Sequence, residues 1–352
     1  PLETESVSDL AISSLLLGNS PFDVLLVDVT WLPKYAAAGW LSPLDEQINP
    51  DDWNSLAYGA NLGNRYKGKI YRLPLVADIG LLYWRTDLME SPPSTPKELM
   101  DISLNLKDKG LIDYGYVWQG RQYEGLSCVF LEILHGFGGE WISKDQEVHL
   151  AKGPALKAAA WLNNLITKGA SPKSVRNFTE NEALQVFQAG KAAFMRNWPY
   201  AWSELQKNSS KVKRKVGVTT MVAEYGQDST ATLGSWGFSI LNKSSHKNEA
   251  FKAIKFLTSN DAQKELFISN GYTPTNAEIF KDNKLINSSP LLPILEEALS
   301  KSVPRPQSPL YAQISDVLQK QLSSIFTGQK GVEKAMGLAE AKTYQIISSA
   351  GN

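Results

Sequence analysis

Short apolar runs alternate with amphipathic segments over the first two thirds of the chain. Residues 22–29 form an apolar run whose length and β-branched content favour a buried parallel strand. The same reasoning predicts further strands at 70–73, 80–84, 192–195, 216–220 and 236–241. Strands that alternate with helices indicate a three-layer α/β architecture.

Helical periodicity fills the segments between these strands. Thr95-Pro96-Lys97-Glu98 is a capping box with proline at the first helical position, which predicts a helix start. Other helices are predicted at 8–17, from near Tyr123 to Gly136, at 154–166 and at 179–188. From Asn248 onward the pattern is almost purely helical. The pattern therefore predicts two α/β lobes followed by a helical C-terminal part.

Composition narrows the class of protein. The 352 residues carry 36 Lys and Arg against 36 Asp and Glu, and this balance argues against nucleic-acid or anionic-membrane binding. One domain per about 150 residues also gives about two domains. No apolar stretch approaches the roughly 18 residues of a membrane span. Ten Trp, thirteen Tyr and twelve Phe are many for one soluble chain, and they need an explanation.

Motifs for catalysis, nucleotides or metals are not found. The chain has no G-x-G-x-x-G, P-loop, H-E-x-x-H or G-x-S-x-G motif. His135, His149 and His246 lie far apart, in contexts where helix capping or solvation accounts for them. The single cysteine, Cys128, lies in an apolar run and is predicted to be a small buried hydrophobe. We therefore predict no enzyme activity, metal or cofactor.

Polar and aromatic residues recur together near predicted strand ends. Asp28 closes the first apolar run and Trp31 follows it, while Asp78 lies in apolar surroundings. The remaining clusters are 118–124, 196–202 and 234–237, and the last places Trp236 between glycines. In open α/β sheets, ligands bind beyond the carboxyl ends of strands. We expect these groups to line such a site.

The chemistry of these clusters suits a carbohydrate. The C–H face of a sugar lies flat on an aromatic ring, and carboxylates or guanidinium groups bind its paired hydroxyls. A single tryptophan is more often part of the core, and Trp53, Trp84 and Trp161 fit that role. Asp28 or Asp78 alone could equally be a helix cap or half of an ion pair. The interpretation as a sugar site depends on four clusters of like composition.

At these residues the sequence resembles the extracellular solute-binding proteins of ABC sugar importers (family 1), in particular the trehalose/maltose-binding branch. The matching stretches are 17–28, 36–41, 73–83, 117–120, 123–126, 196–200, 234–237, and Arg305-Pro306 with Tyr311. They follow the order of the family over nearly the whole chain. On this resemblance, a first strand and helix are expected to precede Pro1.

The resemblance implies a periplasmic-binding-protein fold: two α/β lobes, a hinge of three chain crossings, and a ligand cleft between the lobes. It implies a first lobe of residues 1–78 plus 238–300 and a second lobe of 79–237 plus 301–352. The residues that correspond to disaccharide ligands in the family are Asp28, Asp78, Trp198, Tyr200, Gly234, Trp236 and Arg305. Further ligand contacts are expected from Trp31, Trp118, Tyr123 and Glu124.

The resemblance also implies a function and its partners. The protein would capture a small neutral sugar by hinge closure and deliver it to an ABC permease, as a monomer in a periplasmic or other extracytoplasmic location. A lipid anchor through a segment before Pro1 stays open. The alternatives are a glycoside hydrolase, with Asp28 paired with Asp78 or Glu124, and a chemotaxis ligand module. Trehalose, maltose, sucrose and glucosylglycerol are all open as ligands.

Overall fold

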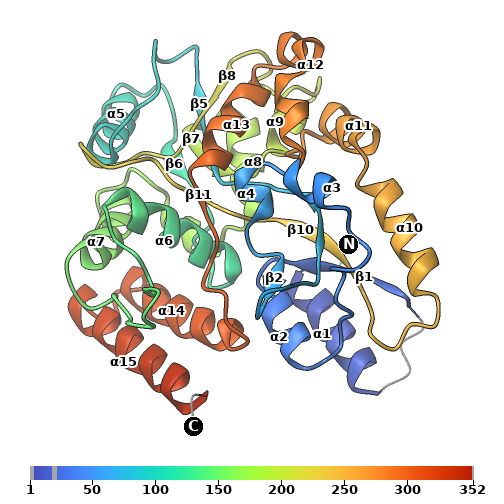
Figure 1. The fold of residues 1–352 in the computed structure, drawn as a ribbon. Coiled ribbons are helices and arrows are strands. Elements are labelled where there is room, and N and C mark those ends of the chain that lie inside the picture. Colours follow the sequence, from blue (N-terminus) through green and yellow to red (C-terminus); the bar gives the residue numbers. More distant parts are fainter. Residues whose placement is uncertain (1–3, 18–21, 351–352) are drawn as a thin grey trace.

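Two separate β-sheets divide the protein into two lobes (Figure 1), in a computed structural model that describes residues 4–17 and 22–350. The first lobe holds the sheet β1 (Val24–Asp28), β10 (Trp236–Ile240) and β4 (Leu73–Val76), in that order. The second holds β6 (Tyr114–Val117), β7 (Ala192–Asn197), β5 (Leu81–Arg85) and β8 (Val216–Thr219). Part of one stretch that carried the family resemblance, residues 18–21, lies outside the described residues.

Helices cover both sheets. The helices of the first half are α1 (Thr4–Leu16), α2 (Leu32–Ala37), α3 (Pro50–Asn54), α4 (Tyr58–Asn61), α5 (Pro96–Asp108), α6 (Glu124–Gly136) and α7 (Pro154–Thr167). Those of the second half are α8 (Glu180–Gln188), α9 (Ala201–Leu205), α10 (Lys247–Leu257), α11 (Asn260–Asn270), α12 (Asn283–Ser288), α13 (Leu291–Ser300), α14 (Tyr311–Phe326) and α15 (Val332–Ala350). Two short 3-10 helices, η1 (Lys173–Asn177) and η2 (Ala277–Lys281), and a hairpin of β2 (Arg65–Tyr66) and β3 (Lys69–Ile70) complete the list.

The prediction of a buried parallel strand at 22–29 is wrong in direction. β1 pairs antiparallel with β10, from Val24 opposite Ile240 to Asp28 opposite Trp236, and Leu26 is 38% exposed. β10 enters this sheet from the second lobe and so runs against β1. Apolar clusters pack around the sheet, one joining Ile240 to α10 and another joining Val27 to α2.

In the second lobe, the predicted helix starts are confirmed in detail. Thr95 caps α5 through the backbone N–H of Glu98, and the Glu98 side chain accepts from the N-cap backbone in return. Thr179 and Glu182 form a second capping box at the start of α8. The predicted helical C-terminal part is also present. Its helices α14 and α15 pack on α6 and α7 (Figure 1). Its one strand among the described residues is β11 (Ser302–Val303).

The chain passes between the lobes in three adjacent segments. The first joins β4 to β5, the second joins β9 (Ala231–Thr232) to β10, and the third leads from β11 to α14. The backbone N–H of Gly234 donates to Asp78 O (2.7 Å), and the N–H of Leu233 donates to Val303 O (2.9 Å). These bonds tie the crossings into one hinge. The three-crossing hinge of the periplasmic-binding-protein fold, which the resemblance implied, is therefore present.

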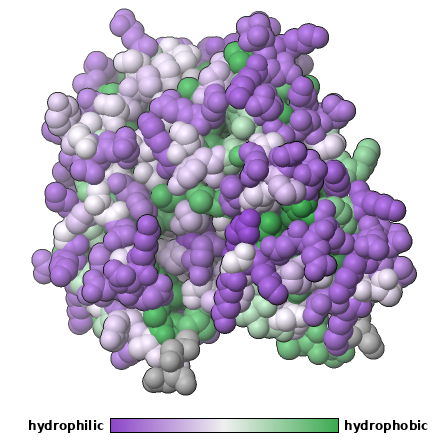
Figure 2. All heavy atoms as spheres, in the orientation of Figure 1, coloured by the Kyte–Doolittle hydropathy of each residue, from purple (hydrophilic) through white to green (hydrophobic). Residues whose placement is uncertain are grey.

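The outside of the protein is mainly polar. Figure 2 shows polar and charged side chains over most of one face, with hydrophobic residues gathered in separate areas. None of the helices in residues 4–17 and 22–350 combines the length and the apolar character needed to cross a membrane.

Candidate functional site at the hinge

Arg305 stands on the third crossing and joins carboxylates from the two lobes. Its Nη1 donates to Glu124 Oε1 (2.8 Å) at the start of α6, and its Nη2 lies 3.3 Å from Asp28 Oδ1 at the end of β1. Arg305 is 3% exposed, and burial alone would lower the pKa of its guanidinium. The negative charges of Asp28 and Glu124 outweigh burial and raise the pKa of Arg305 well above its usual value. The structure thus joins three predicted residues that are far apart in sequence.

The carboxylate of Glu124 is already fully engaged by protein groups. Oε1 also accepts the hydroxyl of Tyr311, and Oε2 accepts the hydroxyl of Ser315 (2.7 Å), both from α14. Since Arg305 is its third partner, Glu124 anchors the arginine to the second lobe.

Asp78 lies on the first crossing and is 7% exposed. Its Oδ1 accepts the backbone N–H of Thr273 (2.9 Å). Burial is the main cause that raises the pKa of Asp78 to about 6, because the backbone hydrogen bond from Thr273 compensates only part of the lost hydration. A buried carboxylate with few hydrogen-bond partners at a hinge is a candidate for ligand binding.

Trp198 follows β7 and is held on three sides. Its Nε1 donates to Glu180 Oε1 (3.0 Å), and the Arg196 guanidinium lies 4.0 Å from the centre of its ring. Its ring edge contacts Gly234 so closely that a Cβ there would lie 2.7 Å from Cζ3. Tyr83 fixes the backbone through a hydrogen bond to Trp198 O (2.9 Å). These contacts hold Trp198 in one orientation at the hinge.

A buried ion pair packs against the ring of Trp198. Arg196 and Glu132 have fully buried side chains and form a bidentate pair through the Nε–Nη2 edge of the guanidinium, with Nε 3.0 Å from Oε2. Glu132 Oε1 also accepts the backbone N–H of Thr232 (3.3 Å). A Cβ on Gly80 would lie 1.8 Å from that oxygen, so only glycine lets the first crossing pass here. The pair therefore links the hinge to the base of Trp198.

The remaining predicted aromatic residues lie around the same region. Trp236, at the start of β10, packs edge-on against Trp31 with ring centroids 5.2 Å apart. The hydroxyl of Tyr123 donates to Glu180 Oε2 (2.8 Å). Tyr200 is half-buried, and its pKa is raised, first by burial and then by Glu180. The structure thus brings together the predicted residues other than Trp118.

Trp118 is a correction. Its side chain is fully buried, its Nε1 donates to Ser171 Oγ (3.0 Å), and its ring packs edge-on against Phe326. It follows β6 and points into the core of the second lobe, so no face is open to a ligand. The prediction that Trp118 is a sugar platform is wrong.

Glu180 is the site residue that sequence reasoning missed. Its only sequence signal is an acidic residue in the first turn of a capped helix, which is common and needs no functional explanation. Its partners Tyr123 and Trp198 lie 57 and 18 residues away, and only the fold brings them together.

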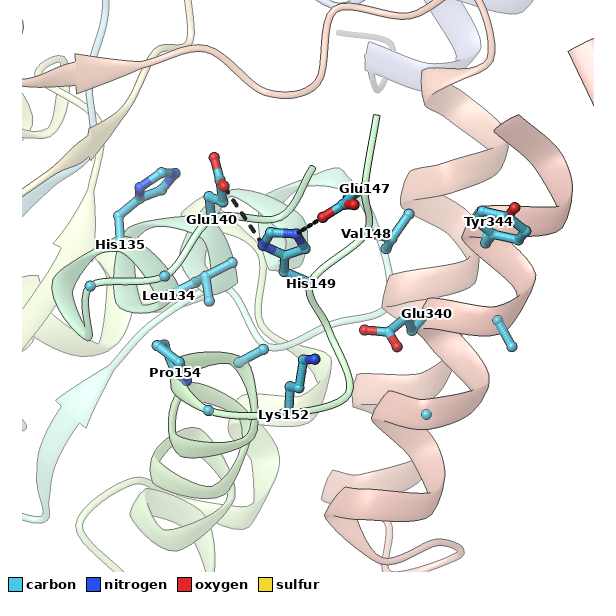
Figure 3. A pocket seen from close by; sticks show the side chains of 16 residues that line it. Leu134, His135, Glu140, Glu147, Val148, His149, Lys152, Pro154, Glu340 and Tyr344 are labelled. Atoms are coloured by element: carbon cyan, nitrogen blue, oxygen red, sulfur yellow. Dashed lines mark ion pairs between the residues drawn. The ribbon is translucent and has the colours of Figure 1, made fainter. Parts of the chain in front are cut away.

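A large cavity lies elsewhere, among α6, α7 and α15 of the second lobe (Figure 3). It measures about 970 Å³, and His149 lies in it between Glu140 (3.6 Å) and Glu147 (3.5 Å). Glu340 Oε2 accepts the backbone N–H groups of Leu150 and Ala151. Glu340 therefore ties the loop before α7 to α15, a structural role. No predicted site residue lines this cavity.

In the part of the chain that the structure describes, no three His, Cys, Asp or Glu side chains come together to hold a metal ion. Cys128 is buried as predicted, and burial raises the pKa of its thiol to about 12.

The lobes, the hinge and the site define the class as a periplasmic-binding-protein fold, and comparison with known proteins gives the family. Residues 3–264 match the model of the bacterial extracellular solute-binding protein family, and the chain belongs to that family. This confirms the family-level resemblance of the sequence. The family is not enzymatic, so the glycoside hydrolase alternative is ruled out.

Relatives and solved structures agree with this assignment. A probable ABC transporter-binding protein of Deinococcus radiodurans is 31% identical, over 97% of this chain and 84% of its own length. The structure of maltose-bound T. maritima MalE3 superposes with a TM-score of 0.89 at 34% identity, over 96% of this chain and 87% of that one. The mannitol-binding protein of Pseudomonas aeruginosa is 25% identical, over 94% of this chain and 81% of its own length.

Proposed function

We propose that this protein captures a neutral disaccharide or a glucosyl compatible solute at the hinge and delivers it to an ABC permease. The observation that carries the proposal is the convergence of Arg305, Asp28, Asp78, Trp198 and Trp236 at one place between the lobes. Flat aromatic faces next to charged hydrogen-bonding groups match the apolar face and hydroxyl rim of a sugar.

Each group has a role in this proposal. Trp198, Tyr200 and Trp236 provide the stacking surfaces, with Trp31 and Tyr123 beside them, while Asp28 and Asp78 accept sugar hydroxyls. Arg305 donates, and its Nε–H is buried without a hydrogen-bond partner among the described residues. A buried donor of this kind is costly until it is satisfied, and a ligand oxygen would satisfy it. Gly234 provides close approach, and Glu124 holds Arg305 in place.

The relatives support the ligand class. The compared proteins include one whose solved structure is maltose-bound, a maltotriose-binding protein of Pyrococcus abyssi at 24% identity, and the mannitol-binding protein. Their names cover oligosaccharides of glucose and a polyol, which share a rim of neighbouring hydroxyls. Trehalose, maltose, sucrose and glucosylglycerol are the candidates that we propose for this chain.

Binding would proceed by closure of the lobes. The ligand docks on one lobe and completes its contacts only when the lobes close, so it shifts the open–closed equilibrium by that difference in affinity. We propose 1–78 plus 238–300 and 79–237 plus 301–352 as the two moving bodies. The closed monomer would then present both lobes to the permease, outside the cytoplasm.

Thermal unfolding with trehalose, maltose, sucrose and glucosylglycerol tests this proposal. A ligand at 100 times its dissociation constant stabilises the protein by about 2.7 kcal/mol, so at least one compound is expected to raise the Tm. Trp236→Ala should abolish the shift, whereas Trp40→Ala, which lies outside the site, should retain it. If none of the four compounds raises the Tm of the unmodified protein, this ligand class is wrong.

A further inference from the structure

We infer that Glu180 is a positioning residue that fixes the aromatic platform before the ligand arrives. One carboxylate holds two rings: Oε1 accepts Trp198 Nε1 (3.0 Å), and Oε2 accepts the hydroxyl of Tyr123 (2.8 Å). Each oxygen accepts one hydrogen bond from a ring, and the inference is that Glu180 acts on a sugar through these rings. The inference rests on the proposed function, because it deepens the role of the same site.

The position of Glu180 in the fold makes it a rigid anchor. It is the first residue of α8, directly after the N-cap Thr179, where the helix dipole favours a negative charge. Its backbone O accepts Asn197 Nδ2 (3.1 Å), and Asn197 Oδ1 accepts the backbone N–H of Trp198 (2.8 Å). The start of α8 and the end of β7 are therefore joined twice, through the indole N–H of Trp198 and through the side chain of Asn197.

The other contacts of Trp198 do not define its orientation as sharply. Arg196 lies over one ring face, and Gly234 limits one ring edge, but neither contact is strongly directional. A hydrogen bond from the indole N–H to a charged oxygen is directional, and it sets how the ring is turned within its slot. Binding sites gain affinity when their side chains are held in the bound geometry in advance. Glu180 provides this for the proposed sugar platform.

Two substitutions measure this role in sugar binding. Glu180→Ala is expected to weaken binding of the sugar found in the thermal screen by about 10-fold, which corresponds to about 1.4 kcal/mol. Glu180→Gln should restore most of the affinity, because its amide oxygen can still accept the indole N–H. In a background that carries both Trp198→Phe and Tyr123→Phe, Glu180→Ala should cost no more than about 2-fold, since both hydrogen bonds to Glu180 are then already lost.

A spectroscopic readout tests the inference without any ligand. In the 1H–15N spectrum of the ligand-free protein, the indole signal that Trp198→Phe removes should move upfield in Glu180→Ala, as its bond to a carboxylate is lost. Glu182→Ala is the matched control: it removes an equal charge from the same helix, but its carboxylate binds Thr179 instead. We expect this control to lower the Tm through the lost cap and to leave the indole signal in place.

The outcomes are distinguishable. An unchanged Trp198 indole signal in Glu180→Ala overturns the inference, whether or not any sugar binds. An equal loss of affinity with and without the paired Trp198→Phe and Tyr123→Phe substitutions also overturns it, because Glu180 would then act independently of both rings. If the indole signal moves but no sugar binds the unmodified protein, the proposed function fails while the positioning contact stands.

Discussion

Gly234→Ala is expected to weaken sugar binding by about 100-fold, or about 2.7 kcal/mol, while the protein remains folded. The new methyl group would lie 2.7 Å from Cζ3 and 2.9 Å from Cη2 of Trp198, so the indole must move. Arg196 blocks one ring face and Glu180 fixes the N–H, so the ring can shift only by giving up a contact. Aromatic anchors of this kind carry a large share of binding energy.

Isothermal titration calorimetry measures this effect, and Gly337→Ala is its matched control. A Cβ on Gly337, in α15, would meet nothing within 4 Å. The control should bind sugar like the unmodified protein and gain about 0.5–1 kcal/mol of stability from the better helix former. Unchanged affinity in Gly234→Ala would show that Trp198 is not held against the second crossing in solution.

Asp78→Asn is expected to stabilise the ligand-free protein at neutral pH. The pKa of Asp78 is raised from 3.8 to about 6, so the folded state holds its proton at pH values where the unfolded chain has released it. Below pH 4 Asp78 is protonated in both states, and the free energy of unfolding is at its highest with respect to this group. It falls as the pH rises from 4 to 6, and at pH 7 the ionised, buried carboxylate destabilises the folded state. At 1.36 kcal/mol per pKa unit, that cost is about 2–3 kcal/mol.

The neutral amide removes this cost and keeps an acceptor for the N–H of Thr273. Urea unfolding at pH 4 and pH 7.5 should show a gain for Asp78→Asn at pH 7.5 only. Asp145→Asn, an exposed residue of equal charge, is the control and should change little. Affinity for sugar should fall roughly 10-fold or more, because a charged acceptor is lost. If Asp78→Asn and Asp145→Asn change the free energy of unfolding by the same amount at both pH values, the burial of Asp78 at the hinge is contradicted.

The sequence predicted most of the fold because its signals are local. The capping box at Thr95 involves residues three apart, and it was found as predicted. The direction of β1 could not be predicted in this way, because its partner β10 lies more than 200 residues away. The short strand β6 was missed, since Gly115 within it weakens the strand signal. That glycine is needed because Ser103 and Ala170 O approach it closely.

The site was predicted mainly through resemblance. A carboxylate at a strand end is ambiguous alone, and the distance between Asp28 and Arg305, 277 residues, is bridged only by the fold. The prediction for Trp118 was wrong because it relied on the composition of the cluster 118–124, which contains both a core tryptophan and proposed site residues. Its partner Ser171 gives no sequence signal. Glu180, Arg196 and Glu132 support the platform from positions whose local sequence indicates only helix and strand.

Small-angle X-ray scattering with and without sugar tests the central claim, capture by closure of two lobes, most directly. The radius of gyration should fall when the sugar from the thermal screen is added at saturation, and Trp236→Ala should show no fall at the same concentration. The fall reports movement of the lobes about the three crossings that meet at Asp78, Leu233 and Val303. A radius of gyration that stays constant under saturating sugar would contradict the account.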